Sequence, residues 1–180
     1  MLQLTLPTLE FFDERLQEFI RMEEQTLMLE HSLMSLSKWE CRWNKAFLSR
    51  KDKTDEELID YVRCMTISEN VDPKAYEMLT REHIEQINDY IAAPMTAVYF
   101  PEGEATFERG DTVTSELIYY WMTILNIPFE CEKWHLNRLF SFIKVCSIKN
   151  SSNKKMSRGE IMRRNASLNA ARRKKYNTRG

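Results

Sequence analysis

Glycine and proline are scarce in this chain, whose 180 residues include four glycines and five prolines. All-β folds need many tight turns, and such turns draw heavily on these two residues. The glycines are too few and too scattered for a phosphate-binding loop, and no G-x-S-x-G, kinase or H-E-x-x-H motif is present. We therefore expect helices joined by short connections, and a protein that is not an enzyme.

Long apolar runs and clustered metal ligands are also lacking. Residues 1–7 have neither the basic start nor the apolar run of a signal peptide, and no stretch approaches the roughly 18 apolar residues of a membrane span. The cysteines form no C-x-x-C pair and lie beside apolar residues, which predicts reduced core thiols; they are Cys41, Cys64, Cys131 and Cys146. The histidines are equally dispersed, at His31, His83 and His135. These features predict a cytosolic protein that needs no cofactor and contacts no membrane.

Apolar residues are plentiful, at 43% of the chain with 20 aromatic residues, so a folded body is expected. The net charge of −1 conceals a strong division. Residues 154–180 contain ten basic residues and one acid, a charge of +9, which leaves 16 basic and 26 acidic residues, a charge of −10, on residues 1–153. Together with the polar stretch at 150–155, this predicts a body over 1–150 and a basic tail over 151–180.

Short strands are predicted near the N-terminus. Leucines at positions 2, 4 and 6 alternate with polar residues ahead of Pro7, which is typical of a half-buried strand. Residues 18–30 also look extended, with the polar 23–25 segment as a turn between two strands, although a helix here is a live alternative. We expect the strand at 2–6 to pair with the strand at 26–30.

Helix starts can be recognised from capping residues. Ser32, Thr54, Thr80 and Thr114 each precede a segment with apolar residues at helical spacing, and Asp72-Pro73 predicts one or two further turns. The first helix is expected to extend to Phe47. Residues 95–111 read as a long loop with a candidate strand at 97–100.

Two strongly apolar helices are predicted near the end of the body, one from Thr114 to about Leu125 and another over 129–148, packed as a hairpin. The tail repeats a capping pattern at Ser157 and then offers little apolar surface, so its helix should gain order from a partner. The fold class expected is mainly α: a compact helical bundle with a small N-terminal β hairpin or sheet and a basic C-terminal helical tail.

Candidate partner-binding residues follow from these patterns. Tryptophans often anchor interfaces, although the spacing of all four here also fits core packing. Exposed cations attract nucleic acid, an acidic partner or another copy of the chain, and the spacing does not choose among them. The candidates are Trp121, Trp134, Arg163, Arg164, Arg172, Arg173, Lys174 and Lys175.

Several strings across most of the chain resemble a family of tailed-bacteriophage proteins, the tail assembly chaperones. They include Leu29-Glu30-His31-Ser32-Leu33, Ser35-Leu36-Ser37-Lys38-Trp39-Glu40, Asp60-Tyr61-Val62-Arg63-Cys64-Met65, Ser115-Glu116-Leu117-Ile118-Tyr119-Tyr120-Trp121-Met122, Ile127-Pro128-Phe129-Glu130, Trp134-His135-Leu136-Asn137-Arg138-Leu139 and the ending from Arg164 to Arg173. The resemblance carries over no catalytic residue, and the loop at 101–110 departs from it in length.

The resemblance implies a protein of the host cell cytoplasm that binds the tape-measure protein, or other phage tail proteins, and keeps that client soluble until the tail tube polymerises. The client groove is expected along residues 115–122 and 134–143, with the tail as a second contact or a self-association arm. Two alternatives stay open. A structural tail or neck subunit would remain in the virion, and a nucleic-acid-binding protein would place the tail on phosphates.

Overall fold

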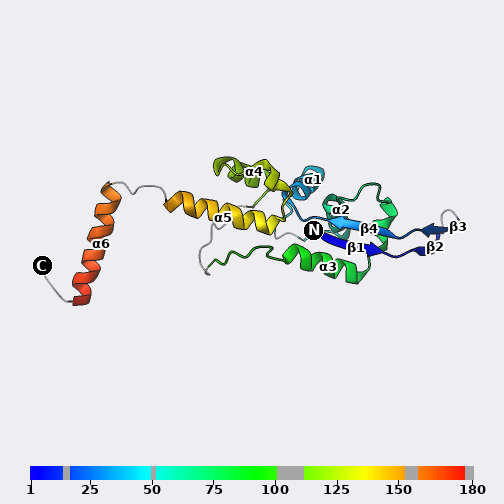
Figure 1. Ribbon diagram of the computed structural model, residues 1–180, viewed down its shortest axis with the longest axis horizontal. Helices are drawn as coiled ribbons and strands as arrows, with labels where there is room; N and C mark the ends of the chain where they lie inside the picture. Colours follow the sequence, from blue (N-terminus) through cyan, green and yellow to red (C-terminus); the bar gives the residue numbers. More distant parts are fainter. Residues whose placement is uncertain (14–16, 50–51, 101–111, 153–157, 177–180) are drawn as a thin grey trace. The chain divides into compact units, whose positions relative to one another are not determined.

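The computed structural model describes residues 1–13, 17–49, 52–100, 112–152 and 158–176. It is mainly helical with a small antiparallel N-terminal sheet, which confirms the predicted fold class (Figure 1). Two compact units are distinguished, Met1–Lys144 and Val145–Gly180. The predicted boundary after residue 150 falls inside the helix α5 (Leu136–Ser152), and the units divide within the same helix.

The N-terminal strands form one interrupted antiparallel ribbon (Figure 1). β1 (Leu2–Leu6) pairs with β4 (Gln25–Leu29), as predicted, and β2 (Leu9–Asp13) pairs with β3 (Glu18–Met22) in the same register. The prediction of a turn at 23–25 is wrong, because β3 and β4 follow one another along one arm of the ribbon. β2 was not predicted. Pro7 explains the interruption, since proline cannot donate a ladder hydrogen bond.

Two helices follow the ribbon. α1 (Leu33–Trp43) is capped by the Ser32 hydroxyl, and α2 (Asp55–Met65) starts at a capping box between Thr54 and Glu57. The predicted extension of α1 to Phe47 is wrong. Asn44 adopts a left-handed conformation with φ of 52°, which ends the helix. Phe47 instead reaches back from the following loop and stacks on the Tyr61 ring at 3.7 Å.

The next segment confirms two further caps. η1 (Pro73–Met78) is a 3₁₀ helix capped by Asp72, and α3 (Arg81–Ala92) begins at Thr80. Residues 95–100 form no strand, contrary to the candidate at 97–100, and the remainder of the predicted loop, 101–111, lies outside the described residues.

The two apolar segments differ in detail from the prediction. α4 (Ser115–Ile124) is capped by Thr114, but the second segment begins as a 3₁₀ helix, η2 (Phe129–Lys133), and becomes α-helical only at α5. The extensive contacts of α4 and η2 are with α1, so the predicted hairpin of α4 with the next helix is not the main packing arrangement.

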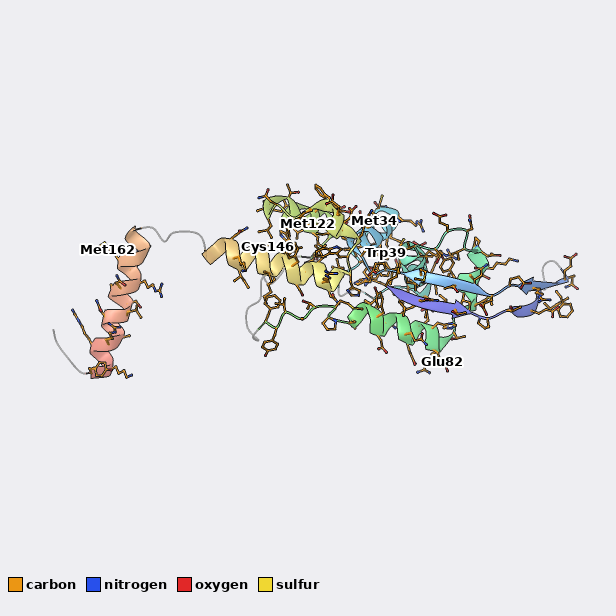
Figure 2. The ribbon with its side chains drawn as sticks, viewed as in Figure 1. Met34, Trp39, Glu82, Met122, Cys146 and Met162 are labelled. Atoms are coloured by element: carbon orange, nitrogen blue, oxygen red, sulfur yellow. The ribbon has the colours of Figure 1, made fainter. Side chains whose placement is uncertain are left out.

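Buried leucines and aromatic residues fill the interior of the first unit. The alternation in β1 and β4 places Leu4, Leu6, Leu27 and Leu29 in one apolar cluster with Trp39 of α1. Figure 2 labels Trp39. The second unit contains α6 (Arg158–Tyr176), the predicted tail helix. Its predicted cap, Ser157, lies outside the described residues.

Candidate functional site

A buried glutamate holds the start of α4 in place. Glu40 of α1 is 7% exposed, and its carboxylate accepts hydrogen bonds from the backbone N–H groups of Phe47 at 2.9 Å and Ser115 at 2.7 Å. Ser115 is the first residue of α4, where unpaired N–H groups and the helix dipole favour a negative charge. The orientation of α4 is therefore fixed by α1.

One face of α4 and the start of η2 leave large apolar side chains in solvent. Tyr120, Ile124 and Phe129 are 59%, 55% and 57% exposed, and the Phe129 ring lies 6.2 Å from the half-buried ring of Tyr119. Tyr120 and Ile124 are one helical turn apart and so lie on one face. We refer to Tyr119, Tyr120, Ile124 and Phe129 as the α4 surface.

Acidic groups border the α4 surface. The Tyr119 hydroxyl donates to the Glu132 carboxylate at 2.7 Å, and Glu116 lies one turn before Tyr120. Hydrogen bonds from its own backbone N–H and from Thr114 lower the pKa of Glu116, which keeps it ionised. Burial and the bond to Glu132 raise the pKa of Tyr119, which keeps its hydroxyl protonated as a donor.

The inward faces of the segments predicted to form the groove belong to the core. Ile118 and Met122 of α4 are fully buried, and so are Leu136 and Leu139 of α5, with Ile143 at 3% exposure. Figure 2 labels Met122. A client could not reach these side chains without unfolding the unit. The surface available to a partner is the opposite, outward face of α4, where Tyr120 and Ile124 lie at i, i+4. Because α4 is apolar around most of its circumference, the sequence gave no signal for which side faces outward.

The two candidate tryptophans are both half-buried and lie in the first unit, whereas the candidate basic residues lie in the second. The Arg138 guanidinium lies 4.2 Å from the centre of the Trp134 ring, and Phe142 packs against the same ring at 5.7 Å. Trp134 therefore has packing contacts with two side chains of α5, and its role in partner binding stays a prediction. Trp121 belongs to α4, and its role in partner binding stays a prediction.

The candidate cations of the tail lie on α6. Arg163, Arg164, Arg172, Arg173 and Lys175 are all exposed. Lys174 belongs to the same helix, but its side chain is outside the described part of the chain. Met162, which is labelled in Figure 2, is 67% exposed and Leu168 is 48% exposed, so these two apolar side chains of α6 face solvent.

Sequence reasoning missed a buried histidine pair. The rings of His31 and His135, 2% and 6% exposed, stand edge to face at 5.2 Å. The Tyr61 hydroxyl bonds Nδ1 of His31 at 2.6 Å, and Nε2 of His135 bonds the Tyr90 carbonyl at 3.0 Å. The Leu136 N–H donates to the His31 carbonyl at 2.7 Å, so this contact joins the end of the ribbon to α5.

Both histidines are held neutral. Burial, with a smaller contribution from the neighbouring His135, lowers the pKa of His31 to about 4, and burial also lowers the pKa of His135. The pair lies 104 positions apart in sequence, so no local signal could have indicated it. Its neutral, hydrogen-bonded rings are those of a structural contact.

The described residues contain no group of three or more His, Cys, Asp or Glu side chains placed to hold a metal ion. Cys64 and Cys131 are buried and Cys146 is half-buried, while Cys41 is exposed, so the prediction of a core thiol is wrong for Cys41. Cys41 stands between Glu40 and Arg42 on α1, and these charged neighbours were the available sequence sign of an exposed position. Within the described ranges, no helix is both long and apolar enough to cross a bilayer.

The chain matches no family model, no curated protein and no solved structure in the three comparisons made.

Proposed function

We propose that this protein is a non-enzymatic tail assembly chaperone of a tailed bacteriophage, acting in the host cell cytoplasm. Its client would be the tape-measure protein. The sequence resemblance supports this proposal, and so does one structural observation: three large apolar side chains of the α4 surface are more than half exposed on a well-packed unit. Clustered exposed apolar residues of this kind are typical of protein-binding surfaces.

The α4 surface suits an amphipathic helix. Tyr120 and Ile124 offer apolar contact at the spacing of one helical turn, and helices bind such surfaces through residues at i, i+3 and i+4. The acidic border formed by Glu116 and Glu132 favours a client whose apolar stripe is flanked by basic residues. Burying that stripe would keep a long helical client from aggregating.

The fixed position of α4 supports the same role. Glu40 bonds the first turn of α4, and Ile118 and Met122 anchor the opposite face in the core. A surface that is already ordered before binding loses little conformational entropy when the client arrives. The α4 surface therefore combines exposure with rigidity.

Co-expression with the tape-measure protein tests this proposal. Replacing Ile124 with Glu places a charge in the centre of the α4 surface and should move the client to the insoluble fraction. Ile67→Glu is a matched control, because Ile67 has the same side chain and 56% exposure against 55% for Ile124. Equal client solubility with the two variants would refute the proposed surface.

The location of the protein after assembly separates this proposal from the structural alternative. A chaperone is released when the tail tube polymerises, so mass spectrometry of purified particles should not detect the chain while detecting the tape-measure protein. Stoichiometric amounts in the particle would instead identify a tail or neck subunit.

A further inference from the structure

The tail helix carries a second kind of surface, distinct from the α4 surface. Its described side chains are exposed along the whole of α6. Two of its described aliphatic side chains, Met162 and Leu168, lie about 120° apart around the axis, at the roughly 100° per residue of an α-helix. A helix that docks in an apolar groove needs a continuous stripe at i, i+3 and i+4, which Met162 and Leu168 do not form.

Polar side chains do form a stripe. Asn165, Asn169, Arg172 and Tyr176 follow one another at i, i+4, i+7 and i+11, and so share one face of α6. All four are exposed. We call them the amide face, from the two asparagines that begin it.

Cations border the amide face on both sides. Arg173 lies to one side, while Arg164 and Lys175 lie to the other, at the same helical geometry. The Lys175 ammonium lies 5.7 Å from the centre of the Tyr176 ring, at the edge of the face. The surface thus has hydrogen-bonding groups along its centre and positive charge along both margins.

This arrangement matches the major groove of B-form DNA. The groove is wide enough for an α-helix, its floor displays base edges that asparagine and arginine recognise by paired hydrogen bonds, and a phosphate strand runs along each margin. The face from Asn165 to Tyr176 is about 16 Å long, at 1.5 Å per residue. That length covers about five base pairs, at roughly 3.4 Å per step.

We propose that α6 binds double-stranded DNA, with the amide face toward the base edges and Arg164, Arg173 and Lys175 on the phosphates. The major groove of A-form RNA is too deep and narrow for this contact. Single strands are bound chiefly by stacked aromatic residues, and the amide face contains one.

Fluorescence anisotropy of the full chain with a labelled DNA duplex of about 20 base pairs tests the phosphate contacts. Affinity should fall steeply with salt, with a log–log slope of about −3 or steeper for three or more phosphate contacts. The triple variant Arg164→Gln, Arg173→Gln, Lys175→Gln should lose at least tenfold in affinity and about three units of slope. Glutamine forms helices as well as lysine and arginine do, so α6 is retained.

A matched control removes three exposed cations from the first unit, as Lys38→Gln, Arg81→Gln and Lys133→Gln. It changes the net charge equally and should leave both affinity and slope near those of the unaltered chain. An equal loss in the two triple variants would overturn the proposal, since a general charge effect would then explain the binding.

Selection from a random duplex library tests the amide face. The unaltered chain should enrich a preferred sequence, and Asn165→Ala with Asn169→Ala should abolish that preference while leaving the salt slope unchanged. Alanine raises helix propensity, so unfolding of α6 could not cause the loss. The proposal is overturned if the library shows no preference, if an RNA duplex binds as tightly as DNA, or if polyglutamate of equal charge competes as well as unlabelled DNA.

Discussion

Replacing His31 with Gln should remove much of the acid sensitivity of the first unit. His31 is neutral in the folded protein, and its pKa falls from 6.5 to about 4 because it is buried. The unfolded chain therefore binds the proton at a higher pH than the folded chain does. The contribution of neutral His31 to the free energy of unfolding is fully present above pH 6.5 and is lost as the pH falls through about 4. The lowered pKa makes this contribution about 3 kcal/mol.

Urea unfolding at pH 7, 6, 5 and 4, followed by tryptophan fluorescence, measures this effect. All four tryptophans lie between Trp39 and Trp134, so the signal reports the first unit. Gln can accept the hydrogen bond of the Tyr61 hydroxyl through its amide oxygen, which keeps that partner satisfied. Carboxylates and His135 titrate in both proteins, so the difference between their pH profiles reports His31 together with its coupling to His135.

The control is His83→Gln, which retains the capping box of α3 because Gln also serves at that position. It should follow the profile of the unaltered chain. If His31→Gln loses as much stability between pH 7 and pH 4 as the unaltered chain does, His31 is not held neutral by burial and the reasoning fails.

Three further changes, one of them with a matched control, test the local structure by urea unfolding. Leu36→Ala empties a fully buried site and should cost about 2–5 kcal/mol, whereas Leu58→Ala, at 45% exposure, should cost less than about 0.5. Thr54→Ala removes the capping box of α2 and should cost about 1 kcal/mol, and a change near zero would show that the cap is not stabilising. Glu40→Ala leaves two backbone donors without their acceptor and should cost more than about 2 kcal/mol, with weaker protection of Ser115 in amide hydrogen exchange; unchanged exchange would contradict its role in holding α4.

Features determined by neighbouring residues could be predicted from the sequence. Caps at Ser32, Thr54, Thr80 and Thr114 all formed, because a capping side chain bonds a backbone group only two or three residues away. The alternation of Leu2, Leu4 and Leu6 likewise indicated a strand directly.

Features determined by tertiary contacts were missed or misplaced. Glu23 and Glu24 are polar residues of the kind found in turns. However, β3 pairs with β2 and not with β4, so the chain keeps its direction from β3 through Glu23 and Glu24 into β4. The apolar spacing wrongly extended the predicted α1 to Phe47. In the structure the left-handed residue Asn44 ends the helix, and the Phe47 ring returns from the following loop to stack on Tyr61, which produces the same apolar spacing without a helix.

The candidate site shows the same limit. Helical periodicity identified α4 as strongly apolar, but only packing on α1 decides that Ile118 and Met122 face inward while Tyr120 and Ile124 face solvent. A helix that is apolar around most of its circumference has no sequence signal for its buried side. For α6, in contrast, the described side chains are exposed on all sides, so the sequence spacing alone tells which residues share a face that a partner can reach.

Site-specific photo-cross-linking in infected cells tests the central claim most directly. A benzophenone amino acid at position 124 reports what touches the α4 surface, and the same group at position 67 is the control. We predict an adduct with the tape-measure protein from position 124 and none from position 67. No adduct from position 124, or equal adducts from both positions, would contradict binding of this client at the α4 surface.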